Sequence, residues 1–196
     1  SGSYSASGFS KDNKDFYYIP DVNKEFTYLV KYKIETGEQE VLFETNWDVM
    51  YSYLSENEKY RVTAINEDGK NTLLIRDIIN NSDVYFPKIP DGDIIGASFS
   101  ESENKIRLTI GTSKSPNNIY VYDMNSKELK KLTETLNPEI NANDLVSAEV
   151  VRYPSFDGLE IPAIYYKPLD ATERNKVPAL VWVHGGPGGQ SRTGYF

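Results

Sequence analysis

The chain has 196 residues, of which 39% are hydrophobic and 13% aromatic, and these values are typical of a globular protein rather than a disordered one. Its formal net charge of −8 repels phosphate backbones, so nucleic acid is not an expected partner. The sequence has no cysteine and a single histidine, His184, and it therefore predicts no disulfide framework, no metal site and no cofactor.

A repeat of 45 residues begins near the N-terminus. The pairs Phe9-Ser10, Leu54-Ser55 and Phe99-Ser100 follow one another at this interval, and each precedes a polar, acid-containing turn. We expect the acidic side chains of these turns to lie in solvent, and they include Glu56, Glu58, Glu101 and Glu103. A period of this size is typical of repeat folds such as propellers.

The same register continues downstream in the first and third copies. Four residues of the first copy reappear 90 positions later, and they are Tyr32, Ile34, Glu38 and Leu42, matched by Tyr122, Met124, Glu128 and Leu132. The middle copy is weaker, because it keeps Ile79 and Asp83 but has Pro87 where a leucine is expected.

Four short strands are predicted within a copy, and in the third they are Ile94 to Phe99, Lys105 to Ile110, Asn118 to Met124 and Leu129 to Thr133. Four strands in one period is the size of a propeller blade, whereas evenly spaced hairpins would also suit a β-sandwich. The Phe-Ser turns and the strand Tyr120-Val121-Tyr122-Asp123-Met124 resemble the propellers of the prolyl oligopeptidase family. We therefore expect a mainly β protein, with about three four-stranded blades in residues 1–134 whose exposed edges can self-associate.

A linker is predicted at residues 135–146, because the run from Thr135 to Asn143 contains Pro138 and polar neighbours that offer no core face. The remaining residues, 147–196, are expected to form the first strands of an α/β-hydrolase domain. Ala148 to Tyr153 and Glu160 to Lys167 predict a hairpin around an Asp-Gly turn. Pro178 to Val183 is almost wholly apolar, which is typical of a strand buried on both faces of such a sheet.

A glycine-rich loop follows this predicted strand, with the sequence His184-Gly185-Gly186-Pro187-Gly188-Gly189-Gln190. Glycine allows the backbone to approach another group closely, and amides at the end of a buried strand can stabilise the oxyanion that forms when a carbonyl is attacked. A plain linking turn and a phosphate-binding loop are the alternatives, although no Gly-Lys-Ser/Thr follows.

The hairpin, the Lys167-Pro168 pair, the apolar run and this loop, continued by Ser191-Arg192, follow propeller blades. In this order they resemble the acylaminoacyl-peptidase and dipeptidyl-peptidase-like branches of the prolyl oligopeptidase family. The resemblance implies that Gly185 and Gly186 lie in the loop that contributes to the oxyanion hole. Other branches have a tyrosine where this sequence has His184, and His184 is therefore expected to orient the loop rather than to act as a base.

The catalytic triad is expected to be absent from this chain, because the nucleophile, the acid and the histidine of an α/β-hydrolase follow the oxyanion loop, and here they would lie beyond Phe196. Ser191, in Gly189-Gln190-Ser191-Arg192-Thr193, imitates a nucleophile elbow but lacks its final glycine. The sequence contains no Gly-x-Ser-x-Gly.

These features predict part of a serine-type peptidase that hydrolyses short peptides or acyl-peptides through an acyl-enzyme and that is inactive as this chain alone. A non-catalytic propeller that binds partners, or a carboxylesterase, are the alternatives. No apolar run approaches the roughly 20 residues that span a bilayer, so no membrane association is expected. A cytoplasmic location is expected, and a periplasmic or secreted one stays open.

Overall fold

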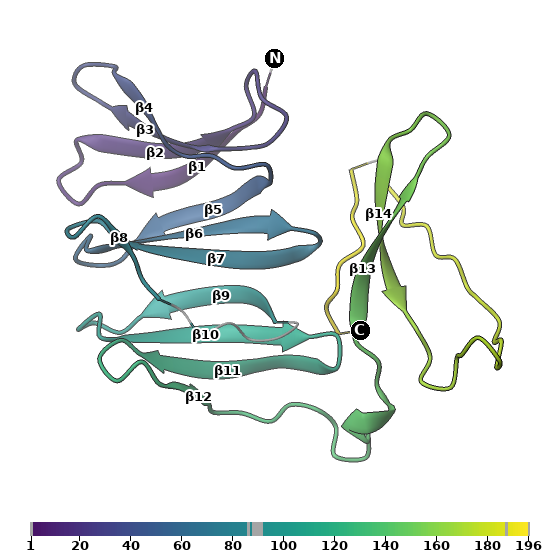
Figure 1. The fold of residues 1–196 in the computed structure, drawn as a ribbon. Coiled ribbons are helices and arrows are strands. Elements are labelled where there is room, and N and C mark those ends of the chain that lie inside the picture. The colour runs from purple at the N-terminus through teal and green to yellow at the C-terminus, as the bar shows by residue number, and fades with distance from the viewer. Residues whose placement is uncertain (1, 86, 88–91, 187, 196) are drawn as a thin grey trace.

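The computed structural model describes residues 2–85, 87, 92–186 and 188–195. Three four-stranded antiparallel sheets follow one another along the chain, and a two-stranded hairpin comes after them (Figure 1). We name the sheets the first, middle and third blade. The first blade contains β1 (Tyr4–Phe9), β2 (Asp15–Pro20), β3 (Leu29–Lys33) and β4 (Gln39–Phe43). The middle blade contains β5 (Asp48–Leu54), β6 (Tyr60–Glu67), β7 (Lys70–Asp77) and β8 (Ser82–Asp83). The third blade contains β9 (Asp93–Phe99), β10 (Lys105–Thr112), β11 (Ser115–Asp123) and β12 (Leu129–Lys131).

Each blade takes four consecutive strands in chain order, and the blades stack face to face (Figure 1). In a β-sandwich the chain would instead pass between two sheets. The arrangement thus matches part of a β-propeller, as the repeat predicts, and the strands predicted for the third copy are all present.

The repeated serine closes the turn between the first two strands of every blade. The N–H groups of Ser10, Ser55 and Ser100 donate to carbonyls five residues ahead at 2.8 to 2.9 Å. Each serine hydroxyl also accepts a hydrogen bond from the residue after the turn, at 2.9, 2.9 and 3.2 Å. A short hydroxyl that bonds its local backbone favours a turn over a continuing strand, which explains why the Phe-Ser pairs recur.

Apolar side chains from facing sheets form the cores. Between the middle and third blades, β6 and β7 contribute residues such as Val62 and Ile75, and the third blade contributes Leu108 and the fully buried Tyr122. The rings of Tyr60 and Phe99 stack across the same boundary with centroids 5.1 Å apart. A smaller core joins the first and middle blades, formed by Tyr17, Ile19, Leu29, Val49 and Ile65. The apolar side chains that alternate along these strands are therefore buried by contact between neighbouring blades rather than within a single sheet.

Two glutamates connect neighbouring blades at their turns. Glu58 Oε1 accepts the backbone N–H of Lys11 at 2.5 Å, and Glu103 Oε1 accepts that of Asn57 at 2.7 Å. Both glutamates have a left-handed backbone, with φ of 57° and 55°. Glu103 is only 6% exposed, so the prediction that these turn carboxylates lie in solvent is wrong for Glu103. It holds for Glu56 and Glu101, which are exposed.

The middle copy departs from the pattern where its sequence does. Its last strand, β8, has only two residues, and Pro87 lies outside any strand. Proline has no N–H to give to a ladder, whereas Leu132, the equivalent residue of the third copy, donates its N–H to the carbonyl oxygen of Ile119 at 2.8 Å.

The chain passes from the third blade to the hairpin through residues 132–147, in which the regular element is a 3₁₀ helix at Ala142–Asp144. The predicted domain boundary falls in this stretch and stays a prediction. The hairpin pairs β13 (Ala148–Pro154) with β14 (Glu160–Tyr166), and Gly158, at φ 85°, closes its turn as the Asp-Gly signal predicts.

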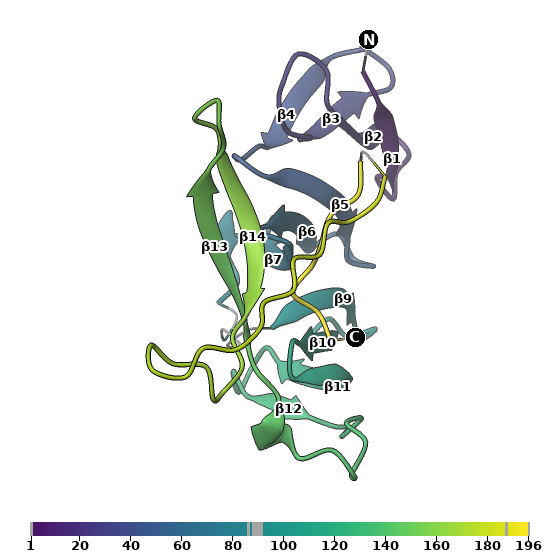
Figure 2. The same cartoon turned by 90° about the vertical axis from the view of Figure 1, so that its right-hand side faces the viewer.

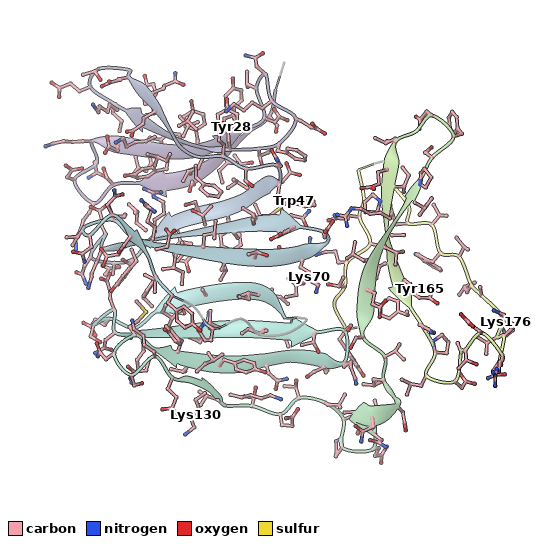
Figure 3. All side chains as sticks on the ribbon, viewed as in Figure 1. Tyr28, Trp47, Lys70, Lys130, Tyr165 and Lys176 are labelled. Carbon is pink, nitrogen blue, oxygen red and sulfur yellow. The ribbon has the colours of Figure 1, made fainter. Side chains whose placement is uncertain are left out.

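The hairpin stands across one end of the blades (Figures 1 and 2). Ala148 N–H donates to Ser113 Oγ, in the turn between β10 and β11, at 2.9 Å. Arg152 pairs with Asp68, in the turn between β6 and β7, at 2.5 Å. In Figure 3, Lys70 lies at the end of the middle blade that faces the hairpin. This end of the blades is therefore the side on which the hairpin lies.

Candidate active-site loop

The apolar run from Pro178 to Val183 is not a strand, so the prediction of a buried strand here is wrong. Leu180, Val181, Trp182 and Val183 are 80 to 89% exposed. A strand of an α/β sheet needs a hydrogen-bonded neighbour and helices over its faces. The described residues supply neither to this run, because their last sheet contains β13 and β14 alone and they include no α-helix.

The glycine loop folds back on itself directly after this run. Gly186 has a φ of 108°, and a Cβ on Gly189 would lie 2.5 Å from the carbonyl oxygen of Gly185. The backbone angle of Gly186 and the close contact at Gly189 both disfavour a side chain, so glycine at positions 186 and 189 permits the loop to close. Pro187 lies outside the described residues.

The amides of Gly185 and Gly186 donate no hydrogen bond to any other described residue. They keep the donor capacity that an oxyanion site needs. Their assignment to an oxyanion hole stays a prediction, because an acyl group and a nucleophile would have to fix the geometry.

His184 makes a local contact, with Nδ1 at 3.0 Å from the carbonyl oxygen of Gly185. The ring is exposed, and within the described chain no carboxylate is bonded to it. A general base needs a hydroxyl within reach and a third group that orients it. The contact supports the prediction that His184 orients the loop, which itself stays a prediction.

Ser191 does not have the setting of a nucleophile. It is exposed, it follows an unpaired loop rather than a strand, and no helix comes after it among residues 192–195. A nucleophile elbow is a sharp strand-to-helix turn. The reading of Ser191 as an imitation of the motif is consistent with this geometry.

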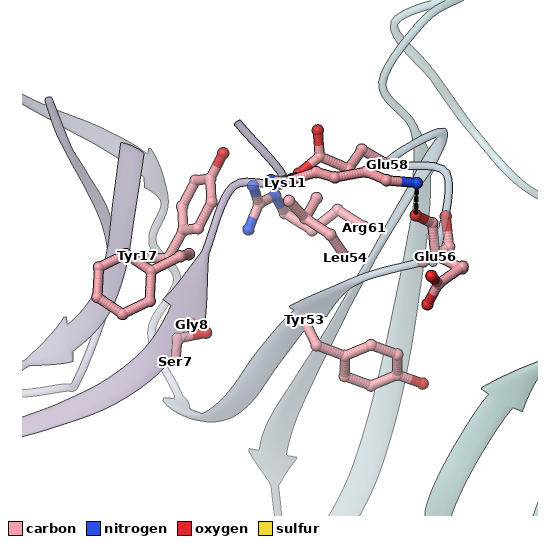
Figure 4. Close-up of a pocket in the computed structure, with 11 residues that line it drawn as sticks. Ser7, Gly8, Lys11, Tyr17, Tyr53, Leu54, Glu56, Glu58 and Arg61 are labelled. Carbon is pink, nitrogen blue, oxygen red and sulfur yellow. Dashed lines mark hydrogen bonds between the residues drawn. The ribbon is translucent and has the colours of Figure 1, made fainter. Parts of the chain in front are cut away.

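Sequence reasoning gave no signal for Arg61, which lies with Tyr17 and Glu58 at a cavity of about 310 Å³ between the first and middle blades (Figure 4). Its guanidinium carbon lies 4.2 Å from the centroid of the Tyr17 ring, and burial lowers its pKa from the usual value. Arg61 lies near the start of β6, so the cavity is at that end of the strand. The glycine loop lies near the opposite end of β6 (Figure 1). The cavity is therefore separate from the candidate loop.

No three His, Cys, Asp or Glu side chains gather as metal ligands would in the part of the chain that the structure describes. Nor does any helix within the described ranges have the length and apolar character required to span a bilayer.

Comparison with known proteins finds similarity in structure alone. No protein-family model matches the sequence, and no curated protein matches it. A puromycin-hydrolyzing peptidase from Mycobacterium tuberculosis matches with a TM-score of 0.69 and 14% identity, over 98% of this chain and 30% of that one. Prolyl oligopeptidase B from Galerina marginata matches with a TM-score of 0.65 and 17% identity, over 84% of this chain and 24% of that one.

A puromycin hydrolase also matches, with a TM-score of 0.66 and 13% identity over 85% of this chain and 26% of that one. The chain spans less than a third of the length of each of these proteins. These structures confirm the resemblance to the prolyl oligopeptidase family at the level of the fold: the chain has the fold of a corresponding part of a prolyl oligopeptidase and of puromycin-hydrolysing enzymes. The particular branches of the family stay a prediction.

Proposed function

We propose that this chain is part of a serine-type peptidase that cleaves short peptides or acyl-peptides through an acyl-enzyme. The observation that carries the proposal is the structural match to peptidases over 84 to 98% of the chain, which takes in both the blades and residues beyond them. In this proposal the blades restrict access to small, unstructured peptides, and the location is cytoplasmic.

The glycine loop would contribute its amides to the transition state. A carbonyl oxygen gains negative charge when a serine attacks, and a backbone N–H aimed at that oxygen is worth roughly 3 to 4 kcal/mol at the transition state. The amides of Gly185 and Gly186 have no competing acceptor among the described residues, which supports this role. The serine, acid and histidine would come from sequence beyond residue 196, and the 196-residue chain alone would be inactive.

A fluorophosphonate probe tests both parts of the proposal. The 196-residue chain should remain unlabelled. A longer polypeptide, which also contains the residues that the gene encodes after residue 196, should be labelled at one serine. That serine should lie in a Gly-x-Ser-x-Gly segment. Stoichiometric labelling of the 196-residue chain would show that the proposed inactivity is wrong.

Two results would point to the alternatives. If the sequence after residue 196 contains no Gly-x-Ser-x-Gly and nothing is labelled, a propeller that binds partners is the better assignment. If the longer polypeptide is labelled but cleaves esters and leaves acyl-peptides and short peptides intact, it is a carboxylesterase.

A further inference from the structure

The adjoining ends of β6 and β7, together with the turn between them, contact the chain at the end of the glycine loop and just after it. Arg192 Nη2 donates to Asn71 Oδ1 at 2.9 Å, and Arg192 Nη1 donates to Asn66 Oδ1 at 3.2 Å. The Asn66 amide donates in turn to Gln190 Oε1 at 2.9 Å. Residues 121 to 126 positions apart in sequence are thus joined by a polar network at this turn.

A buried carboxylate of the third blade belongs to the same network. Asp93 has a side chain that is only 8% exposed, and its Oδ1 accepts the backbone N–H of Asn71 at 2.7 Å. Arg192 Nη2 lies 3.8 Å from the same oxygen. A buried carboxylate is costly unless hydrogen bonds and a cation compensate for its lost hydration. Arg192 supplies that cation from the far end of the chain.

The backbone of this turn also fits the segment closely. Thr193, which is 2% exposed, donates its N–H to the carbonyl oxygen of Gly69 at 3.4 Å. Gly69 has a φ of 76°, and a Cβ there would lie 3.2 Å from the carbonyl oxygen of Ser191. The turn therefore combines a side-chain network with a glycine that lets the two backbones approach.

The other side of the glycine loop has no comparable support, since residues 180–183 are exposed and belong to no strand. Arg192 lies only three positions after Gly189. Gln190, the last residue of the loop, is bonded to the same group through Asn66. We name the network of Asn66, Asn71, Asp93, Gln190 and Arg192 the blade anchor.

We propose that Arg192 is a positioning residue that fixes the glycine loop on the middle blade, so that the blade sets where the amides of Gly185 and Gly186 lie. The anchoring stands on the contacts above. Its catalytic consequence rests on the proposed peptidase function, and the two are tested separately.

The anchoring is tested on the 196-residue chain. Because the sequence has no cysteine, spin labels can be attached through Gly188→Cys, where a Cβ meets nothing within 4 Å, and Lys130→Cys on the exposed face of β12. Double electron–electron resonance should give a narrow distance distribution in the otherwise unsubstituted chain. Arg192→Ala should broaden this distribution. The distribution in Arg192→Lys should be narrower than in Arg192→Ala but broader than in the unsubstituted chain, since lysine keeps the charge but not the paired donors.

Arg174→Ala is the matched control, because Arg174 is exposed and forms no hydrogen bond or ion pair within the described residues. It should leave the distribution narrow. Circular dichroism checks that every variant keeps its β structure. A distribution that is already broad without substitution, or equally narrow in Arg192→Ala, would overturn the anchor.

The catalytic consequence is tested on the longer polypeptide with a short peptide substrate. Displacing a catalytic group by about 1 Å can cost on the order of 100-fold, so Arg192→Ala should lower kcat by about 10-fold to 100-fold with little change in KM. Arg192→Lys should recover part of this loss. An unchanged kcat in a variant whose distance distribution is broadened would refute the positioning role. If the unsubstituted longer polypeptide has no activity, the proposed function is refuted, and the anchor is then tested by the distance measurement alone.

Discussion

Leu108 and Leu180 carry the same side chain in opposite settings. Leu108 lies on β10 between two hydrogen-bonded strands and is fully buried against the middle blade. Leu180 lies in a run that is more continuously apolar, yet it is 89% exposed. The difference shows that apolar character alone does not bury a strand. A neighbouring edge has to satisfy its backbone, and a second layer has to cover its face.

The largest predicted effect compares these two leucines directly. Leu108→Ala should lower the free energy of unfolding by about 2 to 5 kcal/mol, because it removes buried methyl groups and leaves a cavity. Leu180→Ala should change it by less than about 0.5 kcal/mol, as an exposed side chain away from structural features does. Urea unfolding followed by circular dichroism measures both. A loss of more than about 1 kcal/mol in Leu180→Ala would indicate that the run packs against the protein after all.

A smaller effect is predicted for the contact between the middle and third blades at Glu103. Glu103→Ala removes the acceptor of the Asn57 N–H and should cost about 1.5 to 3 kcal/mol, as hydrogen bonds to charged groups do. Glu103→Gln keeps an acceptor oxygen and should lose less. Glu101→Ala, an exposed residue of the same turn, is the control and should stay within about 0.5 kcal/mol of the unsubstituted chain. Equal losses at positions 101 and 103 would argue against a specific contact between blades.

The smallest effect concerns a surface pair within the third blade. Lys105 donates to Asp123 at 2.5 Å, and this bond, together with the N–H groups of Ser126 and Asn125, lowers the pKa of Asp123. A carboxyl whose folded pKa is depressed contributes stability above its unfolded pKa of about 4, and this contribution is lost as the pH falls through the folded pKa. Asp123→Asn should therefore make stability less dependent on pH below about pH 4.

Unfolding midpoints in urea, measured at several pH values from neutral to acid, check this prediction. The difference between Asp123→Asn and the unsubstituted chain should shrink as the pH falls and should also shrink in high salt, which screens exposed pairs. A difference that grows on acidification would contradict the assigned sign.

The sequence predicted the blades because their information is local. The recurring serines close turns through their own hydroxyls and neighbouring amides, so a spacing of 45 residues located the strand boundaries of the third blade to within three residues.

The failures share one physical cause, which is dependence on distant partners. The run from Pro178 to Val183 has the composition of a buried strand, but its burial requires neighbours that composition cannot report. The sequence around Glu103 predicts a turn residue in solvent, but in the folded chain the preceding blade covers its side chain. The sequence did not indicate the contact of Arg192 with the blade, because its partners Asn66 and Asn71 are remote in sequence and ordinary in type. Local patterns thus fixed the repeating elements, and the candidate site depends on contacts that only the folded chain reveals.

The two glutamate contacts give the stack of blades a polarity. Glu58 and Glu103 each reach back to the turn of the preceding blade, and the equivalent position of the first blade, 45 residues before Glu58, holds Asn13, which has one methylene fewer. The blades are consequently not interchangeable modules. A chimera that placed the first blade after the third would bring the shorter Asn13 to a joint where a glutamate makes the bond in the native order. Such a chimera would need Asn13→Glu to form the same contact.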